Sequence, residues 1–188
     1  MKLKYVDGMK IRNTLDTDFC VIGSNRIYPY IPKNEIWFDR KYKKEEKHFL
    51  KVHLFELKLM KKMSYEKVRV IVEKKFLVKI DKDKIPNFVV RKRRYKGFIV
   101  KYVDGRIVRK FIDPKFVLGM HFIGEKPERK EIWIDIRQNK KEYKYTLIHE
   151  YSEAKLMKKG MNYNNAHDYA IAAEKVARRK DGAKYLRD

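Results

Sequence analysis

The spacing of hydrophobic and polar residues changes along the chain, and the same change occurs twice. Short stretches with alternating apolar residues, such as "EIWIDI" at residues 131–136, are typical of half-buried β-strands. Longer stretches with helical spacing follow, and we expect helices at residues 141–159 and 162–180. Gly160 is expected to end the first helix and Asn162 to cap the second. The pattern predicts a helical hairpin that follows a small sheet.

The strands before each hairpin are expected to form that sheet. "YVDG" occurs at residues 5–8 and 102–105, and Asp-Gly between β-branched and aromatic residues predicts a β-hairpin turn. In the second half, "FIVKYV" and "RIVRKFI" would be its two arms. Further strands are expected in "FVLGMHFIG" at residues 116–124 and near Pro86. Strands first and helices last predict an α+β fold with a mostly antiparallel sheet.

Several short sequences recur, in the same order, at a shift of about 97 residues. The matching pairs are "YVDG" with itself, "DTDF" with "DPKF", "EIWFD" with "EIWID", "KLMKK" with itself, and "MSY" with "MNY". Preserved order with a nearly constant shift predicts two tandem copies of one unit, each a small sheet followed by a helical hairpin. The predicted domains are residues 1–91 and residues 92–188.

Composition adds a strong positive charge to this picture. The 188 residues include 48 Lys and Arg against 25 Asp and Glu, a formal charge of +23, so nucleic acid is a candidate partner. Cys20 is the single cysteine, which excludes an internal disulfide and a multi-thiolate zinc site. No stretch approaches the roughly 18 apolar residues of a membrane span, and "MKLKYVDGMK" lacks the apolar run of a signal peptide. We therefore expect a cytoplasmic protein with no membrane partner.

The densest basic cluster lies between the two copies. It consists of Arg91, Lys92, Arg93 and Arg94, followed by Tyr95. Such a cluster is typical either of a nucleic-acid contact or of a solvated linker, and the sequence contains no groove-reading motif that would decide between them.

Four residues of the second hairpin form the strongest candidate site. On a helix, His149 and Glu153 lie about 40° apart, and Glu150 falls within the same arc of about 100°. Glu153 is seven residues before Gly160, and His167 is seven residues after it. Residues equally far from the turn of an antiparallel hairpin lie level with each other. The pattern therefore predicts that His167 faces Glu153.

The chemistry of these side chains suits a metal ion. Two imidazoles and one carboxylate, from His149, His167 and Glu153, are a ligand set for zinc or another divalent transition metal with one position open to water. Glu150 follows the first ligand and is placed to take a proton from that water as general base.

The same residues carry a family resemblance. "HEYSE" resembles the HExxH helix of zincin metallopeptidases, with Glu153 in place of the second histidine and His167 where the gluzincin branch has a glutamate. The wider pattern, over most of residues 97–179, is similar to short uncharacterised phage and microbial proteins with an HExxE helix followed by an Ala-His helix. The resemblance implies a metallopeptidase-like site with His149, Glu153 and His167 as ligands and Glu150 as base.

A zincin-like site also implies a peptide substrate. In zincins a strand beside the active-site helix can hold an extended peptide, and "EIWIDI" would serve if it lay at an exposed sheet edge. Packing in the core is the simpler interpretation of Trp133, because Trp37 is its counterpart in the first copy.

Two other functions remain open. The chain can be a basic nucleic-acid-binding protein of viral or mobile-element type, in which the histidines and carboxylates are structural or bind a metal without chemistry. Alternatively, the metal only joins the two helices of the hairpin.

The first copy lacks the ligand set. Alignment of the repeats places Val52, His53 and Glu56 at the positions of the HExxE residues, and Arg69 at the position of His167. We expect Glu56 and Arg69 to form an ion pair across the first hairpin. The remaining histidines, His48, His53 and His121, have no convergent partners in the sequence and are expected to be structural or on the surface. Asp168 is expected to be exposed.

Overall fold

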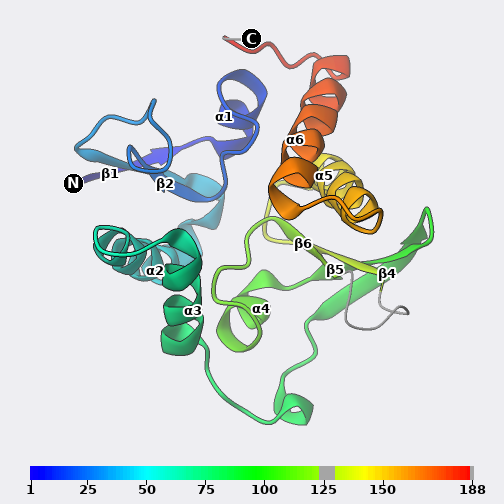
Figure 1. Cartoon of the computed structure of the whole chain (residues 1–188), viewed down its shortest axis with the longest axis horizontal. Coiled ribbons are helices and arrows are strands. Elements are labelled where there is room, and N and C mark those ends of the chain that lie inside the picture. The colour runs from blue at the N-terminus through cyan, green and yellow to red at the C-terminus, as the bar shows by residue number, and fades with distance from the viewer. Residues whose placement is uncertain (123–129, 187–188) are drawn as a thin grey trace. The chain divides into compact units, whose positions relative to one another are not determined.

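The computed structural model describes residues 1–122 and 130–186. Within these residues the fold is mixed α+β, with two small sheets and six α-helices (Figure 1). The strands are β1 (Lys2–Val6), β2 (Ile22–Ser24), β3 (Glu35–Asp39), β4 (Val89–Tyr95), β5 (Phe98–Val103), β6 (Gly119–Phe122) and β7 (Glu131–Asp135). The α-helices are α1 (Gly8–Thr14), α2 (Glu46–Leu59), α3 (Tyr65–Phe76), α4 (Gly105–Phe111), α5 (Tyr143–Met157) and α6 (Tyr163–Lys180).

The chain forms two compact units, and each draws on both halves of the sequence. The first unit comprises residues 1–8, 19–88 and 104–117, and the second comprises residues 9–18, 89–103 and 118–188. Helix α4 thus belongs to the first unit, and α1, from Met9 onward, belongs to the second. The predicted domains 1–91 and 92–188 follow the sequence repeat, whereas each compact unit takes residues from both of these ranges. The two domains therefore stay a prediction.

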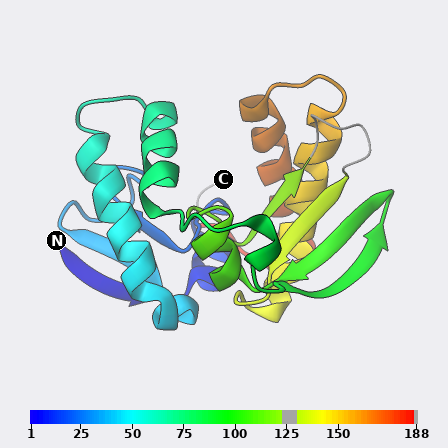
Figure 2. The same cartoon turned by 90° about the horizontal axis from the view of Figure 1, so that it is seen from below.

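The first unit has a three-stranded sheet in the order β1-β3-β2, with β1 parallel and β2 antiparallel to β3. Helices α2 and α3 form an antiparallel pair, which Figure 2 shows in cyan and green. Val52, Val68 and Val72 make a buried cluster between these two helices. Helix α4 contributes Arg109, whose side chain is 1% exposed and donates to the Phe116 carbonyl and to the Glu45 carboxylate. A buried guanidinium needs such partners, because an unpaired charge in the core is costly.

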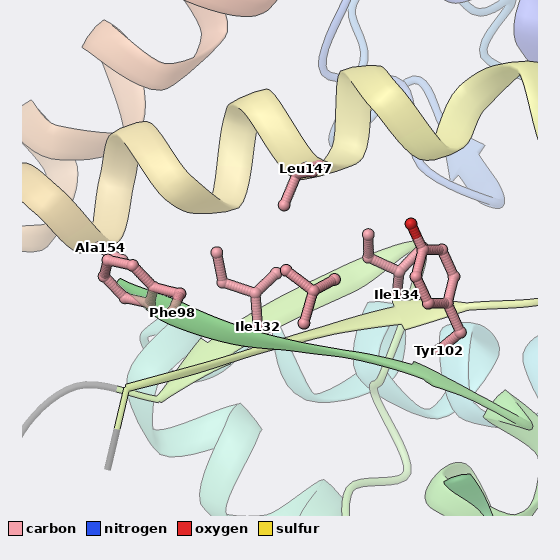
Figure 3. Close-up of a cluster of buried hydrophobic side chains, with 7 residues drawn as sticks. Phe98, Tyr102, Ile132, Ile134, Leu147 and Ala154 are labelled. Atoms are coloured by element: carbon pink, nitrogen blue, oxygen red, sulfur yellow. The ribbon is translucent and has the colours of Figure 1, made fainter. Parts of the chain in front are cut away.

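The second unit has a four-stranded sheet in the order β4-β5-β7-β6. Strands β5 and β7 are parallel, and the other two pairings are antiparallel. Helix α5 packs on one face of this sheet (Figure 3), where Leu147 and Ala154 meet apolar side chains of β5 and β7. These include Phe98, Ile132 and Ile134. Burial of each large apolar side chain stabilises the fold by roughly 1.5–3 kcal/mol, so this cluster fixes α5 against the sheet.

The predicted helical hairpin is confirmed, with α5 and α6 side by side (Figure 1). Gly160 has φ 92°, a left-handed conformation that favours glycine at a helix end. Asn162 caps α6 by accepting a hydrogen bond from the backbone N–H of Asn165 at 3.0 Å. Ala166 and Ala170 are fully buried, and such small residues allow close approach of the two helices.

The predicted β-hairpins at both "YVDG" sequences are wrong, because a short helix follows each of them. At the second "YVDG" the Asp104 carboxylate accepts from the backbone N–H of Arg106 and caps α4. Strand β5 pairs in parallel with β7, and a parallel pair needs a crossover connection rather than a tight turn. The true hairpin joins β4 and β5 through Lys96 and Gly97, which have φ 46° and 83°. Positive φ at both central residues is typical of a tight hairpin turn.

Strand β7 is central, which corrects two expectations about "EIWIDI". It lies between β5 and β6, so it cannot be the exposed edge that holds a peptide. Trp133 is 3% exposed and packs against Phe122 with ring centroids 4.6 Å apart, which confirms its place in the core. Asp135 is also buried, so the strand is covered on both faces rather than half-buried.

The other predicted strands are present over part of their length. Strand β6 covers the middle of "FVLGMHFIG", and residues 123 and 124 of that stretch lie outside the described residues. The basic cluster forms most of β4, so it is not an irregular linker. None of the helices in the described part of the chain has the length and apolar character that a membrane span requires.

Candidate metal centre

The hairpin brings three predicted ligands to one point in the second unit. His149 and Glu153 lie on consecutive turns of α5, and His167 lies in the second turn of α6. His149 Nε2 is 3.2 Å from His167 Nδ1 and 3.3 Å from Glu153 Oε2. His167 Nδ1 is 3.0 Å from the same Glu153 oxygen. One atom from each side chain thus forms a nearly equilateral triangle, and this group could hold a metal ion.

A carboxylate lies beside the outer nitrogen of each imidazole. His149 Nδ1 is 2.9 Å from Glu174 Oε2 on α6, and His167 Nε2 is 3.4 Å from Asp18 Oδ1. Arg178 in turn donates to Glu174 Oε1 at 2.8 Å. Carboxylates in these positions set the tautomer and the orientation of each ring, so that the inner nitrogens face Glu153.

The three inner groups are strongly coupled by charge. Burial lowers the pKa of His149, but hydrogen bonds to Glu153 and Glu174 outweigh it and raise this pKa to about 10. Hydrogen bonds to Asp18 and Glu153 raise the pKa of His167 to about 9. Burial raises the pKa of Glu153, yet the two histidines lower it to about 2. The cluster therefore favours positive charge between its carboxylates, which a proton or a metal cation can supply.

Glu150 lies next to this triangle and is held by a residue from the sheet. His121 on β6 has its Nδ1 3.0 Å from Glu150 Oε2 and 3.8 Å from Glu153 Oε1. The backbone of β6 approaches α5 closely at Gly119, where a Cβ atom would lie 2.5 Å from Thr146 Cγ2 and 3.1 Å from Glu150 Cγ. Glycine leaves room for these side chains of α5, and the approach places His121 beside Glu150.

The structure also contains site residues that the sequence analysis missed. His121 was expected to have no partner, and that expectation is wrong. Glu174 had a signal in the sequence, because it follows His167 by seven residues and so lies on the same face of α6. Asp18 and His121 had none, because their contacts arise from segments far away in the chain. Asp168 is exposed, as expected.

The basic cluster lies away from these residues. Strand β4 is at the opposite end of the sheet from β6. Side chains alternate along a strand, so Arg91 and Arg93 share one face and Lys92 and Arg94 the other. Arg91 and Arg93 both lie over the Tyr102 ring, at 3.8 and 5.8 Å from its centroid.

The corresponding residues of the first unit do not form a ligand set. Glu56 is buried, and its Oε1 lies 2.6 Å from Lys115 Nζ. The predicted pairing of Glu56 with Arg69 is wrong, since Arg69 pairs with Glu73 one turn along its own helix. A lysine from the segment after α4 reaches Glu56, and the sequence alignment of the two hairpins did not include that segment. His53 is 1% exposed, which confirms it as structural.

In comparisons with protein-family models, curated proteins and solved structures, no match to the chain was found.

Proposed function

We propose that the chain is a zinc-dependent hydrolase acting on peptide bonds, with His149, Glu153 and His167 as ligands and Glu150 as general base. The triangle of ligand atoms is the observation that carries this proposal. Its sides of 3.0, 3.2 and 3.3 Å match the separation of about 3.3 Å expected between ligands of a tetrahedral zinc ion with bonds of about 2.0–2.1 Å.

The surroundings of the two imidazoles also fit a metal. A metal-binding histidine usually donates its other N–H to a carboxylate, and Glu174 and Asp18 lie in those positions. Two nitrogens and one carboxylate oxygen suit zinc better than calcium or magnesium, which prefer oxygen ligands. The set leaves one coordination position for water, as a catalytic zinc requires.

Glu150 has the position of a base in this arrangement. Bound zinc would make a water molecule acidic near neutral pH. The Glu150 carboxylate, held by His121 beside the ligands, would take that proton and later transfer it to the leaving group. His121 orients this base through its contact with Glu150 Oε2.

A peptide is the proposed substrate class. Strand β6 ends the sheet in the part of the chain that the structure describes, and at Gly119 it lies against α5. Its outer edge, rather than that of β7, would hold an extended chain by main-chain hydrogen bonds next to the ligands.

We also propose that the two halves arose by duplication and that only one copy kept the site. The strand orders β1-β3-β2 and β5-β7-β6 have the same parallel and antiparallel pairings. Arg12 pairs with Glu142 at 2.6 Å, and Arg109 pairs with Glu45 at 3.0 Å. The two arginines are 97 positions apart and so are the two glutamates, so each unit contains one of these two equivalent pairs, with a member from each half. In the first copy Glu56, the counterpart of the proposed ligand Glu153, pairs with Lys115 instead. The role proposed for this copy is therefore structural.

Elemental analysis of the purified, untagged protein tests the metal site. We expect about one equivalent of zinc in the wild type and little in His149→Ala or His167→Ala. His48→Ala, which removes a histidine of the first unit, is the matched control and should keep the metal. Equal metal content in all four proteins would refute the ligand assignment.

Hydrolysis of a mixed peptide library then tests the chemistry. Glu150→Gln should retain the metal and lose at least about a hundredfold in rate, because it removes the proton acceptor. Metal binding without hydrolysis in the wild type, together with a lower melting temperature after chelation, would instead favour a metal that only joins the helices.

A further inference from the structure

A second feature of the second unit is a pocket of about 590 Å³ that contains none of the proposed metal ligands. It lies between strand β4 and the start of α5, whereas the candidate ligands lie further along α5 and near the start of α6. Its lining residues are Arg91, Arg93, Tyr102, Lys140, Lys141, Tyr143, Lys144, Tyr145 and Asp181. The pocket is therefore both basic and aromatic.

Most of the positive charge at this pocket has no negative partner. Of the five cationic side chains, Lys144 pairs with Asp181, the single acidic lining residue. Among the residues that the structure describes, Arg91, Arg93, Lys140 and Lys141 have no ion-pair partner. The four positive side chains around this pocket repel each other. Binding of an anion in the pocket reduces this repulsion and is therefore favoured.

Tyrosine rings line part of the pocket. Tyr102 is 3% exposed and carries the Arg91 guanidinium 3.8 Å above its ring, which holds that guanidinium in one plane. Tyr143 is half-buried, and its ring centroid lies 5.4 Å from that of Tyr102. Flat guanidinium and aromatic surfaces offer stacking positions for nucleobases.

We infer that this pocket binds a single-stranded nucleic acid, with backbone phosphates held by Arg93, Lys140 and Lys141 and a base stacked on the exposed Arg91 guanidinium that lies over Tyr102. A cationic groove with aromatic stacking surfaces is the usual means of holding single strands. The four cations are exposed and are divided between β4 and the start of the helical segment. Exposed single contacts are weak, so a ligand with several linked phosphates gains most from this arrangement.

Fluorescence anisotropy with a labelled 12-nucleotide single strand tests this inference. The double variant Arg93→Ala with Lys141→Ala removes one cation from each side of the pocket. Lys58→Ala with Lys74→Ala is the matched control, since it removes two exposed lysines of the first unit and changes the net charge equally. We expect about a tenfold or greater loss of affinity in the pocket variant and less than a twofold loss in the control.

The salt dependence of binding and two competitors complete the test. The slope of log affinity against log salt should fall by about 1–2 in the pocket variant, because two phosphate contacts are lost, and stay unchanged in the control. Unlabelled single strand should displace the probe at lower concentration than ATP or a duplex of equal length. Equal losses in both double variants, or displacement by ATP or the duplex at concentrations as low as those of the single strand, would overturn the inference.

Discussion

Glu174 Oε2 lies 2.9 Å from His149 Nδ1, and Arg178 holds the other oxygen of the same carboxylate at 2.8 Å. The carboxylate is buried and therefore has little freedom to move. This chain of contacts runs from Arg178 to His149 and fixes the imidazole with Nε2 toward Glu153. The orientation of one proposed ligand thus depends on two residues of α6 that would not touch the metal.

Replacement of Glu174 by Gln should weaken metal binding. The amide keeps the shape of the side chain but loses the charge that makes His149 a stronger ligand, and changes of this kind cost about 10–100-fold in metal affinity. Competition with a chromophoric chelator measures the dissociation constant for zinc.

Glu73→Gln provides the control for this change. Glu73 is 40% exposed and pairs with Arg69 in the first unit. Its replacement removes the same charge from the protein and should leave the zinc affinity unchanged. An equal affinity of Glu174→Gln and wild type would show that Glu174 does not position His149.

The parts of the site that the sequence predicted depend on local signals. The hairpin follows from helical spacing, the Gly160 terminator and the Asn162 cap, and equal distances from the turn bring Glu153 and His167 together. The contacts of His121 and Asp18 depend on how distant segments pack against the hairpin. Single-sequence patterns carry no information about such packing, so these residues could not be predicted.

The fold shows the same division between local and long-range causes. A short helix, rather than the second arm of a hairpin, follows each "YVDG" sequence, because the parallel pairing of β5 with β7 requires a crossover connection instead of a tight turn. That pairing joins residues about 30 positions apart and leaves no signal in the turn itself. For the same reason the partner of Glu56 was predicted to be Arg69, on the adjacent helix, whereas it is Lys115, far along the chain.

Gly119→Ala should displace β6 from α5. The new methyl group would lie 2.5 Å from Thr146 Cγ2, so the Thr146 side chain, the strand or the helix must shift, at a cost of about 1–3 kcal/mol in unfolding free energy. His121 and Glu150 would move apart, and peptide hydrolysis should fall more than metal content. Urea denaturation and the activity assay measure the two effects.

A second substitution tests the cause of that loss. Thr146→Ser removes the methyl group that the alanine would meet and keeps the hydroxyl that donates to Gln138 Oε1 at 2.9 Å. The double variant should therefore regain part of the stability lost in Gly119→Ala. Additive destabilisation in the double variant would contradict a clash at Thr146.

Lys115→Ala should destabilise the first unit without changing metal content. Glu56 is 8% exposed, and removal of its cation leaves a buried carboxylate unpaired, a change that costs about 3–5 kcal/mol in other proteins. Arg69→Ala is the comparison, because its pair with Glu73 is largely exposed and should contribute less than about 1 kcal/mol. Loss of zinc from Lys115→Ala would contradict the assignment of the metal to the second unit alone.

His53 should make the protein sensitive to mild acid. Burial, together with the smaller effect of the positive charge of Lys115, lowers the pKa of this histidine from an ordinary value of 6.5 to about 4. The folded protein therefore binds this proton less readily than the unfolded chain. The corresponding stability is fully present above about pH 6.5 and is lost as the pH falls toward 4, by up to about 3 kcal/mol.

The variant His53→Leu separates this contribution from that of other groups. Leucine fills a similar volume and cannot be protonated, so the unfolding free energy of the variant should fall less steeply than that of the wild type between pH 6.5 and 4. Between pH 7.5 and 8.5 the two proteins should have parallel profiles, because His53 is neutral there in both the folded and unfolded chain. Urea denaturation at several pH values gives both profiles. Parallel profiles across the acidic range as well would mean that His53 binds its proton equally well in the folded and unfolded chain, and would contradict the lowered pKa.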